Sequence, residues 1–421
     1  MTPDPVQPSY RALFAIPRLG RVIASMQIAR VAQQMVSVAI VLFVLDHFRS
    51  PQLAGLVTLT SILPGLLLAP IAGALLDRHG RTRLIILDYL VALAAFVLLG
   101  SLALADVLTV PLLIAITVLS SLTSILSHTG LRSLFPLLVP RPLWERVNAI
   151  DSNGYVVATI LGPPVAAALV SIAGGPLALI VIGLSFGLAA VALIGAPDPA
   201  SDTASTGNLL RDAWDGVRYT WSNRTLRGLG FSIATLNIAG GMTAIVIPLI
   251  VLERLQAGEL AVGLVFATSG VTGMVSAFLA GRIDTRGREW RMLVVPMVLY
   301  APVLALLLPA AQATDVVLGL ALASLSFGLF GALTGPMDIA LFTVRQRRTD
   351  PAWMGRAFAV SMAFNYAGYP IGAALAGYLA ARSIESAVIV GIAAVFIGAA
   401  FAAVLVPRRD PLTDAAADAP A

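Results

Sequence analysis

The sequence contains no cysteine and no lysine, and charged residues of any kind are scarce. Without cysteine the chain can form no disulfide, no thiolate metal site and no cysteine nucleophile. Only 12% of the 421 residues are charged, whereas 58% are hydrophobic. An ordinary soluble domain is about half apolar and about a quarter charged. This composition therefore favours an integral membrane protein.

Residues that carry catalysis are also few. The chain has 3 histidines and no His-x-x-Glu-His pattern, and a Gly-x-x-x-x-Gly-Lys phosphate loop is impossible without lysine. We therefore expect no enzyme, no metal site, no cofactor and no use of ATP.

Two further features are absent. The 27 basic residues, all arginine, are spread through short segments without interleaved aromatics, which argues against a nucleic-acid partner. The N-terminal stretch MTPDPVQPSYRALFAIPRLGR is polar and broken by proline, so we expect no cleaved signal peptide.

What the chain does have is a series of long apolar runs. A helix needs about 20 apolar residues to cross the hydrocarbon core of a bilayer. Twelve such runs are present, at 22–46, 52–76, 84–105, 110–131, 150–173, 176–196, 229–252, 260–281, 292–311, 316–342, 357–381 and 386–406. The sequence therefore predicts an all-α protein with twelve transmembrane helices.

The arginines predict the orientation of these spans. If the N-terminus is cytoplasmic, 23 arginines fall in cytoplasmic segments and 3 in external ones, with Arg30 inside the first span. Such a bias follows the positive-inside rule. Both termini are therefore predicted to be cytoplasmic.

The spans form two similar halves. An offset of 207 residues places RVAQQM (30–35) on NIAGGM (237–242) and DRHGR (77–81) on DTRGR (284–288). An offset of 210 places Arg146 on Arg356. Such a parallel repeat is typical of transporters whose halves rock about a midplane site. We predict six-helix bundles at 1–196 and 229–407, a cytoplasmic linker at 197–228 with an amphipathic helix around 208–221, and a cytoplasmic tail at 408–421.

The loop between the second and third spans carries a recognisable motif. Its sequence GALLDRHGRTR (73–83) resembles the signature of the major facilitator superfamily, broadly Gly-x-Leu-x-Asp-Arg-x-Gly-Arg-(Arg/Lys)-x-(Arg/Lys). The resemblance implies the major facilitator fold, two pseudo-symmetric six-helix bundles, and a loop that helps hold the outward-open state. The implied gating residues of this loop and its repeat are Gly73, Asp77, Arg78, Gly80, Arg81, Arg83, Asp284, Arg286, Gly287 and Arg288.

Other segments resemble one branch of that family. The stretches 131–150, 209–229 and 350–379, and the pair Ala29-Arg30, are similar to drug:proton antiporter-like proteins such as macrolide and enterobactin exporters. Exporters of the superfamily often carry Gly-Pro-x-x-Gly-Gly in the fifth span. Here GPPVAA keeps Gly162 and Pro163, followed by Pro164, and has alanines at the last two places. The basic residue common in the middle of the fourth span of such antiporters is absent.

Polar groups inside the spans are the candidate functional residues, because a charge in the membrane is costly and usually marks function. We expect substrate binding or proton coupling from Arg30, Gln33, Gln34, His128, Asn237, Asp338, Asn365 and Tyr366. Arg30 is expected to bind substrate or an acidic partner such as Asp338, or to form a static pair that locks helix packing. His128 and Asp338 are candidate proton carriers, and the alternative for Asp338 is a pair with Arg345. Asp88 and Asp151 are expected near the cytoplasmic interface, paired with loop arginines.

These observations lead to a functional hypothesis. The chain is expected to be a secondary-active transporter that exports amphipathic drug-like or siderophore-like molecules by alternating access, driven by the proton motive force. A facilitator or importer of a small polar solute, and a non-transporting membrane sensor, are the alternatives. The expected partners are the lipid bilayer, a small-molecule substrate and protons, for a monomer in the bacterial cytoplasmic membrane.

Overall fold

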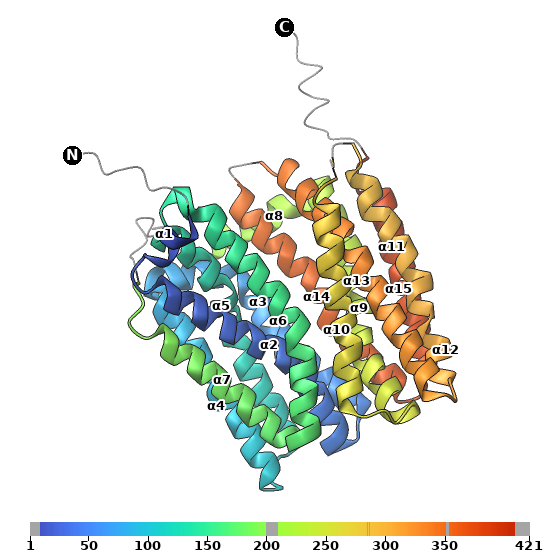
Figure 1. The fold of residues 1–421 in the computed structure, drawn as a ribbon. Helices are drawn as coiled ribbons and strands as arrows, with labels where there is room; N and C mark the ends of the chain where they lie inside the picture. Colours follow the sequence, from blue (N-terminus) through green and yellow to red (C-terminus); the bar gives the residue numbers. More distant parts are fainter. Residues whose placement is uncertain (1–8, 199–208, 284, 286, 351–352, 409–421) are drawn as a thin grey trace, which may run out of the picture. The chain divides into compact units, whose positions relative to one another are not determined.

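The computed structural model describes residues 9–198, 209–283, 285, 287–350 and 353–408. In this part of the chain every regular element is a helix (Figure 1). The long helices are α2 (Leu19–Phe48), α3 (Pro51–His79), α4 (Arg81–Leu104), α5 (Val110–Leu138), α6 (Trp144–Ala173), α7 (Gly175–Leu193), α9 (Arg224–Leu249), α10 (Glu259–Ala280), α11 (Glu289–Ala305), α13 (Val316–Arg347), α14 (Met354–Ala380) and α15 (Ile384–Leu405). Short elements are α1 (Tyr10–Phe14), η1 (Arg141–Leu143), α8 (Leu209–Ser222), the π-turn η2 (Ile250–Arg254) and α12 (Leu307–Gln312).

Each predicted span lies on one long helix, the seventh continuing into η2 and the ninth into α12. Eleven of these helical stretches are long and apolar enough to cross a membrane. The remaining helix, α14, has 27 residues and is also long enough, at about 1.5 Å per residue, but it carries the polar residues Asn365, Tyr366 and Tyr369. The predicted all-α membrane fold is confirmed.

Several helices extend beyond their apolar runs. The run predicted to end at 342 continues as α13 to Arg347, and α6 begins at Trp144 rather than near 150. Arg345, which the positive-inside count treats as a loop residue, therefore lies within a helix. Hydropathy marks the hydrocarbon-facing part of a helix, whereas the helix itself can continue past it.

The described chain divides into two compact units. Unit 1 comprises residues 1–40 and 64–209, and unit 2 comprises residues 41–63 and 210–421. Residues 41–63, the end of α2 and the start of α3, thus group with unit 2, whereas the sequence places them in the first six-helix half. The predicted boundaries of the two halves stay a prediction.

Within unit 1, α4 packs against α5 and α7, and Figure 1 shows α4 and α7 side by side. Phe186 of α7 stacks on Phe96 of α4, with 6.0 Å between ring centroids. In α6, Gly162 lets the helix approach α2 closely, because a Cβ there would lie 2.4 Å from the Cβ of Gln34. This close approach sets the register in which polar residues of α2 face α6.

Within unit 2, α9 packs against α14 and α15, α10 packs against α13, and α11 packs against α13 and α15. The amphipathic helix α8 leads into α9, whose first turn is capped by the side chain of Asn223. Its position agrees with the stretch where the sequence predicts such a helix.

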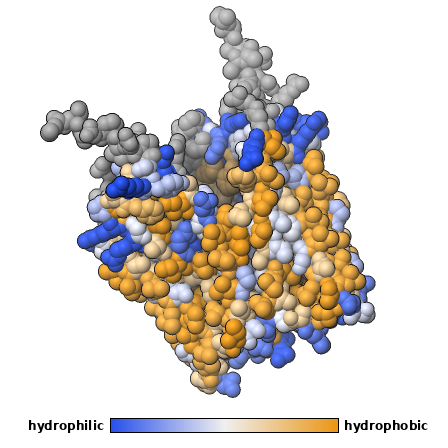
Figure 2. Space-filling view, in the orientation of Figure 1, coloured by the Kyte–Doolittle hydropathy of each residue, from blue (hydrophilic) through white to orange (hydrophobic). Residues whose placement is uncertain are grey.

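The surface is strongly apolar along the helices. Figure 2 shows hydrophobic residues over most of the visible face and hydrophilic residues gathered toward the helix ends. Exposed side chains include Ile172 (85%), Val317 (75%) and Val404 (72%). Exposing so much hydrocarbon to water is energetically unfavourable, whereas contact with the acyl chains of a bilayer is not.

Candidate functional site

An ion pair joins α2 to α6 inside unit 1. One terminal nitrogen of the Arg30 guanidinium lies 2.5 Å from Oδ1 of Asp151, and the other donates to the main-chain carbonyl of Asp151, also at 2.5 Å. The side chains are 10% and 15% exposed. Arg30 follows the start of α2 by 11 residues, or about 16 Å along the helix axis. Arg30 therefore lies well inside the candidate membrane span of α2, whereas Asp151 lies 5 residues after Arg146, where the candidate span of α6 begins.

The ion pair identifies the acidic partner of Arg30. Asp338 is the example of an acidic partner expected from the sequence, and Asp151 is expected to pair with loop arginines, but the acid that binds Arg30 is Asp151. One turn of α6 beyond Asp151, Gly154 leaves room for the side chain of Gln27, which contacts the spot where a Cβ would stand. Small residues on α6 and polar residues on α2 thus meet along one seam.

Gln34 lengthens the contact between α2 and α6, and Gln33 adds α5 to it. Gln34 donates to the hydroxyl of Thr159 on α6 at 3.2 Å, and Gln33 donates to the hydroxyl of Ser127 on α5 at 3.4 Å. In this structure both amides therefore make contacts between helices. Arg30, Gln33 and Gln34 are brought together with Asp151, as neighbours on one stretch of α2.

Asp88 of α4 joins the same region of unit 1. Its side chain is 4% exposed, and the hydroxyls of Ser127 and Thr123 on α5 lie within hydrogen-bonding reach of its carboxyl group. The expectation that Asp88 pairs with loop arginines is wrong, since its hydrogen-bonding partners are these hydroxyls. Next to Ser127, His128 is exposed on α5. The hydroxyl-rich run SSLTSILS (120–127) is the sequence signal that could have pointed to this cluster.

Asp338 of α13 differs from the acids of unit 1. Its side chain is exposed, and among the described residues it has no hydrogen-bond or ion-pair partner. Arg345 lies two helical turns further along α13 and is completely buried, at 0% exposure. The two form no ion pair, so the expected alternative of an Asp338–Arg345 pair is wrong.

The remaining candidates of unit 2 lie on α9 and α14. Asn237 of α9 donates to the main-chain carbonyl of Asn365 on α14 at 2.8 Å. The donors and acceptors around Asn365 assign its amide oxygen to the side of Arg345, and in that orientation the oxygen accepts a hydrogen bond from the Arg345 guanidinium at 2.5 Å. Tyr366 is 48% exposed and stacks on Tyr369, with 5.7 Å between ring centroids. Arg345 is the residue of this group that sequence reasoning missed.

The predicted gating loop of unit 1 is the turn from α3 to α4. Gly80 has φ = 92°, a backbone angle that favours glycine, and it caps α4. Arg78 and Arg83 are exposed and Arg81 is partly buried, whereas the burial of Gly73 and Asp77 in α3 lies outside what the structure describes. Thr82 next to this turn donates its main-chain N–H to Asp198 at 3.2 Å.

The corresponding turn of unit 2 is only partly described. Asp284 and Arg286 lie outside the described residues, Gly287 has φ = 72°, and Arg288 is exposed before α11. Close by, Arg347 of α13 forms an ion pair with Glu289 of α11. The structure thus places α11 and the end of α13 in contact through charged side chains.

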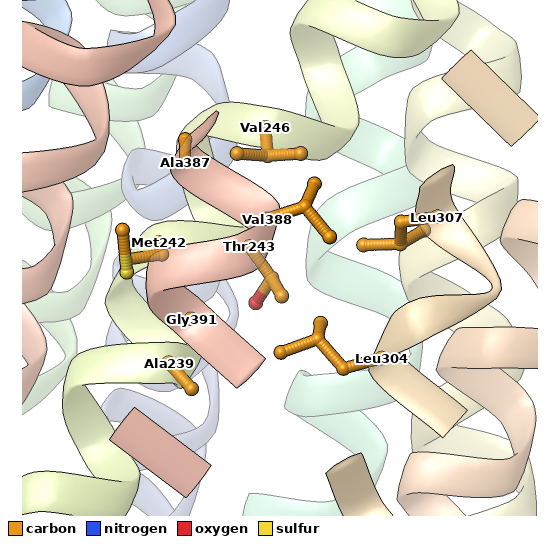
Figure 3. A pocket seen from close by; sticks show the side chains of 9 residues that line it. All are labelled: Ala239, Met242, Thr243, Val246, Leu304, Leu307, Ala387, Val388 and Gly391. Carbon is orange, nitrogen blue, oxygen red and sulfur yellow. The ribbon is translucent and has the colours of Figure 1, made fainter. Parts of the chain in front are cut away.

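Unit 2 also contains a crevice whose lining is almost entirely apolar. It lies between α9, α11, α12 and α15, and Figure 3 shows Leu304, Leu307 and Val388 directed into it. Its lining consists of Ala239, Met242, Thr243, Val246, Leu304, Leu307, Ala387, Val388 and Gly391. The crevice leaves no room for a water molecule, so it serves helix packing. No group of three His, Asp or Glu residues in the described chain lies close enough to hold a metal ion.

Long lipid-compatible helices that carry a buried charge pair and a separate carboxyl group define a polytopic membrane protein of the transporter class. The chain belongs to the major facilitator superfamily, whose family model matches residues 23–350 and 229–421. The fold and the loop motif predicted from the sequence agree with this membership.

Two curated relatives are similar over most of the chain. An uncharacterised MFS-type transporter, y4rN of Sinorhizobium fredii, is 35% identical over 407 residues, which cover 95% of this chain and 98% of that protein. The multidrug efflux pump Tap of Mycolicibacterium fortuitum is 25% identical over 351 residues, which cover 80% and 83%.

Solved structures confirm the fold. The nucleoside transporter NupG (D323A mutant) matches with a TM-score of 0.69 at 12% identity, covering 91% of this chain and 98% of that one. A bacterial homologue of the iron transporter ferroportin, in its inward-facing state, matches with a TM-score of 0.68 at 18% identity, covering 92% and 98%. At these identities the likeness concerns the arrangement of helices.

Proposed function

We propose that this major facilitator transporter is a proton-coupled exporter of amphipathic small molecules that works by alternating access. The observation that carries the proposal is Asp338, a carboxyl group within the membrane-spanning helix α13 that has no hydrogen-bond or ion-pair partner among the described residues. An ionisable group inside a span is costly and by default functional. A carboxyl group that no arginine neutralises is free to take up and release a proton during each cycle.

The similarity of this chain to the efflux pump Tap supports export as the direction of transport. Tap, at 25% identity, is a multidrug efflux pump, and the similarity extends over 80% of this chain. We therefore propose export, from the cytoplasm, by a monomer in the bacterial cytoplasmic membrane, with both termini cytoplasmic as the arginine distribution predicts.

The other candidate residues have different roles in this proposal. The Arg30–Asp151 pair holds α2 against α6, and Gln33 and Gln34 reinforce the same contacts. Tyr366, which is exposed and stacked on Tyr369, offers an aromatic face to an amphipathic substrate. His128, exposed on α5, is the second candidate proton carrier. The turns at Gly80 and Gly287 are proposed to act in gating.

One proton per cycle is enough to drive useful export. A charge that crosses about 100 mV releases about 2.3 kcal/mol. Since about 1.4 kcal/mol corresponds to a factor of ten, this energy sustains roughly a fifty-fold substrate gradient.

The test is uptake into everted membrane vesicles under an imposed pH gradient, across a panel of amphipathic compounds. Export in the cell appears as uptake that depends on an acidic vesicle lumen, and Asp338→Asn is expected to abolish that dependence. Asp315→Asn is the matched control, because Asp315 caps the N-terminus of the same helix and asparagine caps equally well. Full retention of gradient dependence in Asp338→Asn contradicts the role of Asp338. Uptake driven only by the opposite gradient favours the importer alternative.

A further inference from the structure

A second buried cation has no acidic residue among its contacts in the described part of the chain. Arg345 is among the largest fully buried side chains, and none of its contacts in the described chain is a carboxylate. Its guanidinium donates to the sulfur of Met362 at 2.7 Å and to the amide oxygen of Asn365 at 2.5 Å. The nitrogen Nε has no hydrogen-bond partner among the residues that the structure describes. A buried guanidinium normally has an anionic partner, because burial of an uncompensated charge is strongly unfavourable.

The surroundings of Arg345 are those of an incomplete polar site. Phe358, Ser361, Met362 and Asn365 follow one another along one face of α14, and the guanidinium lies against that face, 5.1 Å from the ring centroid of Phe358. The hydroxyl of Ser361 is buried and likewise makes no hydrogen bond to any described residue. Within the described chain, the Arg345 Nε–H group on α13 and the Ser361 O–H group on α14 are therefore two buried donors that make no hydrogen bond.

A comparison with unit 1 identifies what is missing. The offset of 210 residues that places Arg146 on Arg356 places Asp151 on Ser361. In unit 1 a buried arginine is neutralised by the carboxylate of Asp151, whereas in unit 2 the corresponding position of α14 carries only a hydroxyl group. The cation of unit 2 thus lies beside the place where unit 1 has its anion.

We propose that Arg345, Ser361 and Asn365 form an anion-binding subsite that takes the carboxylate of an aromatic or amphipathic solute. The guanidinium supplies charge and N–H donors, Ser361 supplies an O–H donor, and Phe342 and Phe358 flank the guanidinium at 5.5 and 5.1 Å and offer apolar faces to the rest of the molecule. The closest partners of α13 are α10 and α11, and the closest partner of α14 is α9, so separation of α13 from α14 would open the subsite. The subsite deepens the proposed function, on which it rests, because it names the chemical class of the substrate.

The test measures binding and needs no transport. Purified protein in an uncharged detergent is titrated with 2-naphthoate and with the neutral analogue 2-naphthamide, and binding is followed by thermal stabilisation. We expect 2-naphthoate to stabilise the protein and 2-naphthamide to have little effect. Arg345→Met is expected to weaken 2-naphthoate about ten- to a hundredfold, the size of a lost charge-assisted hydrogen bond. Arg347→Gln, which removes the same charge from an exposed side chain two residues away, is expected to bind as the wild type does.

If Arg345→Met fails to fold, a second variant tests the same subsite. Ser361→Asp supplies a built-in carboxylate where unit 1 has Asp151, so it should pair with Arg345, raise the thermal midpoint and abolish 2-naphthoate binding. If Ser361→Asp instead lowers the midpoint and leaves binding intact, the subsite is overturned. Equal stabilisation by 2-naphthoate and 2-naphthamide, or by 2-naphthoate in wild type and Arg345→Met, overturns it as well.

The anion of a lipid headgroup shares this chemistry, so the titration is repeated with phosphatidylglycerol in mixed micelles. An Arg345-dependent effect of the lipid without one of 2-naphthoate overturns the assignment to a solute. Because no gradient is applied, loss of 2-naphthoate binding leaves proton-coupled export standing, and absence of export leaves the binding result standing.

Discussion

Removal of one member of the Arg30–Asp151 pair should destabilise the protein far more than removal of both. Arg30→Met leaves the Asp151 carboxylate buried, and Asp151→Asn leaves the guanidinium buried, with side chains that are only 10% and 15% exposed. Breaking a buried ion pair in this way costs about 3–5 kcal/mol. With both charges gone, no buried charge is left uncompensated, and the cost should fall to about 1 kcal/mol, that of a lost neutral hydrogen bond.

The double-mutant cycle therefore has an expected coupling free energy of several kcal/mol. It is measured by unfolding wild type, both single variants and the double variant in mixed micelles with an increasing fraction of sodium dodecyl sulfate, followed by circular dichroism. Arg49, which directly follows α2, and Asp46, in the last turn of that helix, form the control pair. Their side chains are 83% and 64% exposed and 3.7 Å apart, so the coupling there should stay below about 1 kcal/mol. Additive effects of Arg30→Met and Asp151→Asn would refute the assignment of a stabilising pair.

Transport by the same four proteins distinguishes the two roles of Arg30. If the pair only locks α2 against α6, the double variant should recover substrate affinity and rate along with stability. If Arg30 also binds substrate, the double variant should be stable and still show weakened affinity. Recovery of stability without recovery of affinity would therefore argue against a purely structural role.

Substitutions at three further positions test local features of the fold by thermal unfolding. Gly162→Val should destabilise by about 1–3 kcal/mol, because its side chain would overlap Gln34 where α6 approaches α2, and Gly162→Ala should cost less. Gly80→Ala should cost about 1–3 kcal/mol, because φ is 92° there, and an unchanged midpoint would show that the turn adapts. Asn223→Ala should cost about 1 kcal/mol through loss of the cap of α9, whereas Asn223→Asp should keep it; equal loss in both would point to the bond from Asn223 to the Arg348 carbonyl instead.

The membrane fold could be predicted because hydrocarbon imposes a simple condition on sequence. A span must bring about 20 apolar residues in succession, and this pattern is visible without knowledge of packing. The helix ends were harder to predict. The positive-inside rule predicts Arg345 in a loop, because arginine normally leaves the hydrocarbon region, yet α13 continues through it to Arg347.

The partners of the charged residues could not be predicted, because they depend on how the helices are rotated against each other. Asp151 meets Arg30 since Gly154 and Gly162 bring α6 close to α2 in one register. A single sequence shows the small residues of α6 and the polar residues of α2, but not that they face each other. The same limitation hid the contact of Arg345 with α14.

A tryptophan between α13 and α14 can serve as a fluorescence probe of this turn. Trp353, which precedes α14, stacks on Tyr219 of α8 with 4.9 Å between ring centroids and 7° between planes. The hydroxyl of Tyr219 also accepts the main-chain N–H of Asp350 at 2.9 Å. A change at the end of α13 would alter this stack, and indole emission responds to its surroundings. With the other 4 of the chain's 5 tryptophans replaced by phenylalanine, the fluorescence of Trp353 would report in real time how this end of the helix responds to ligands and to pH.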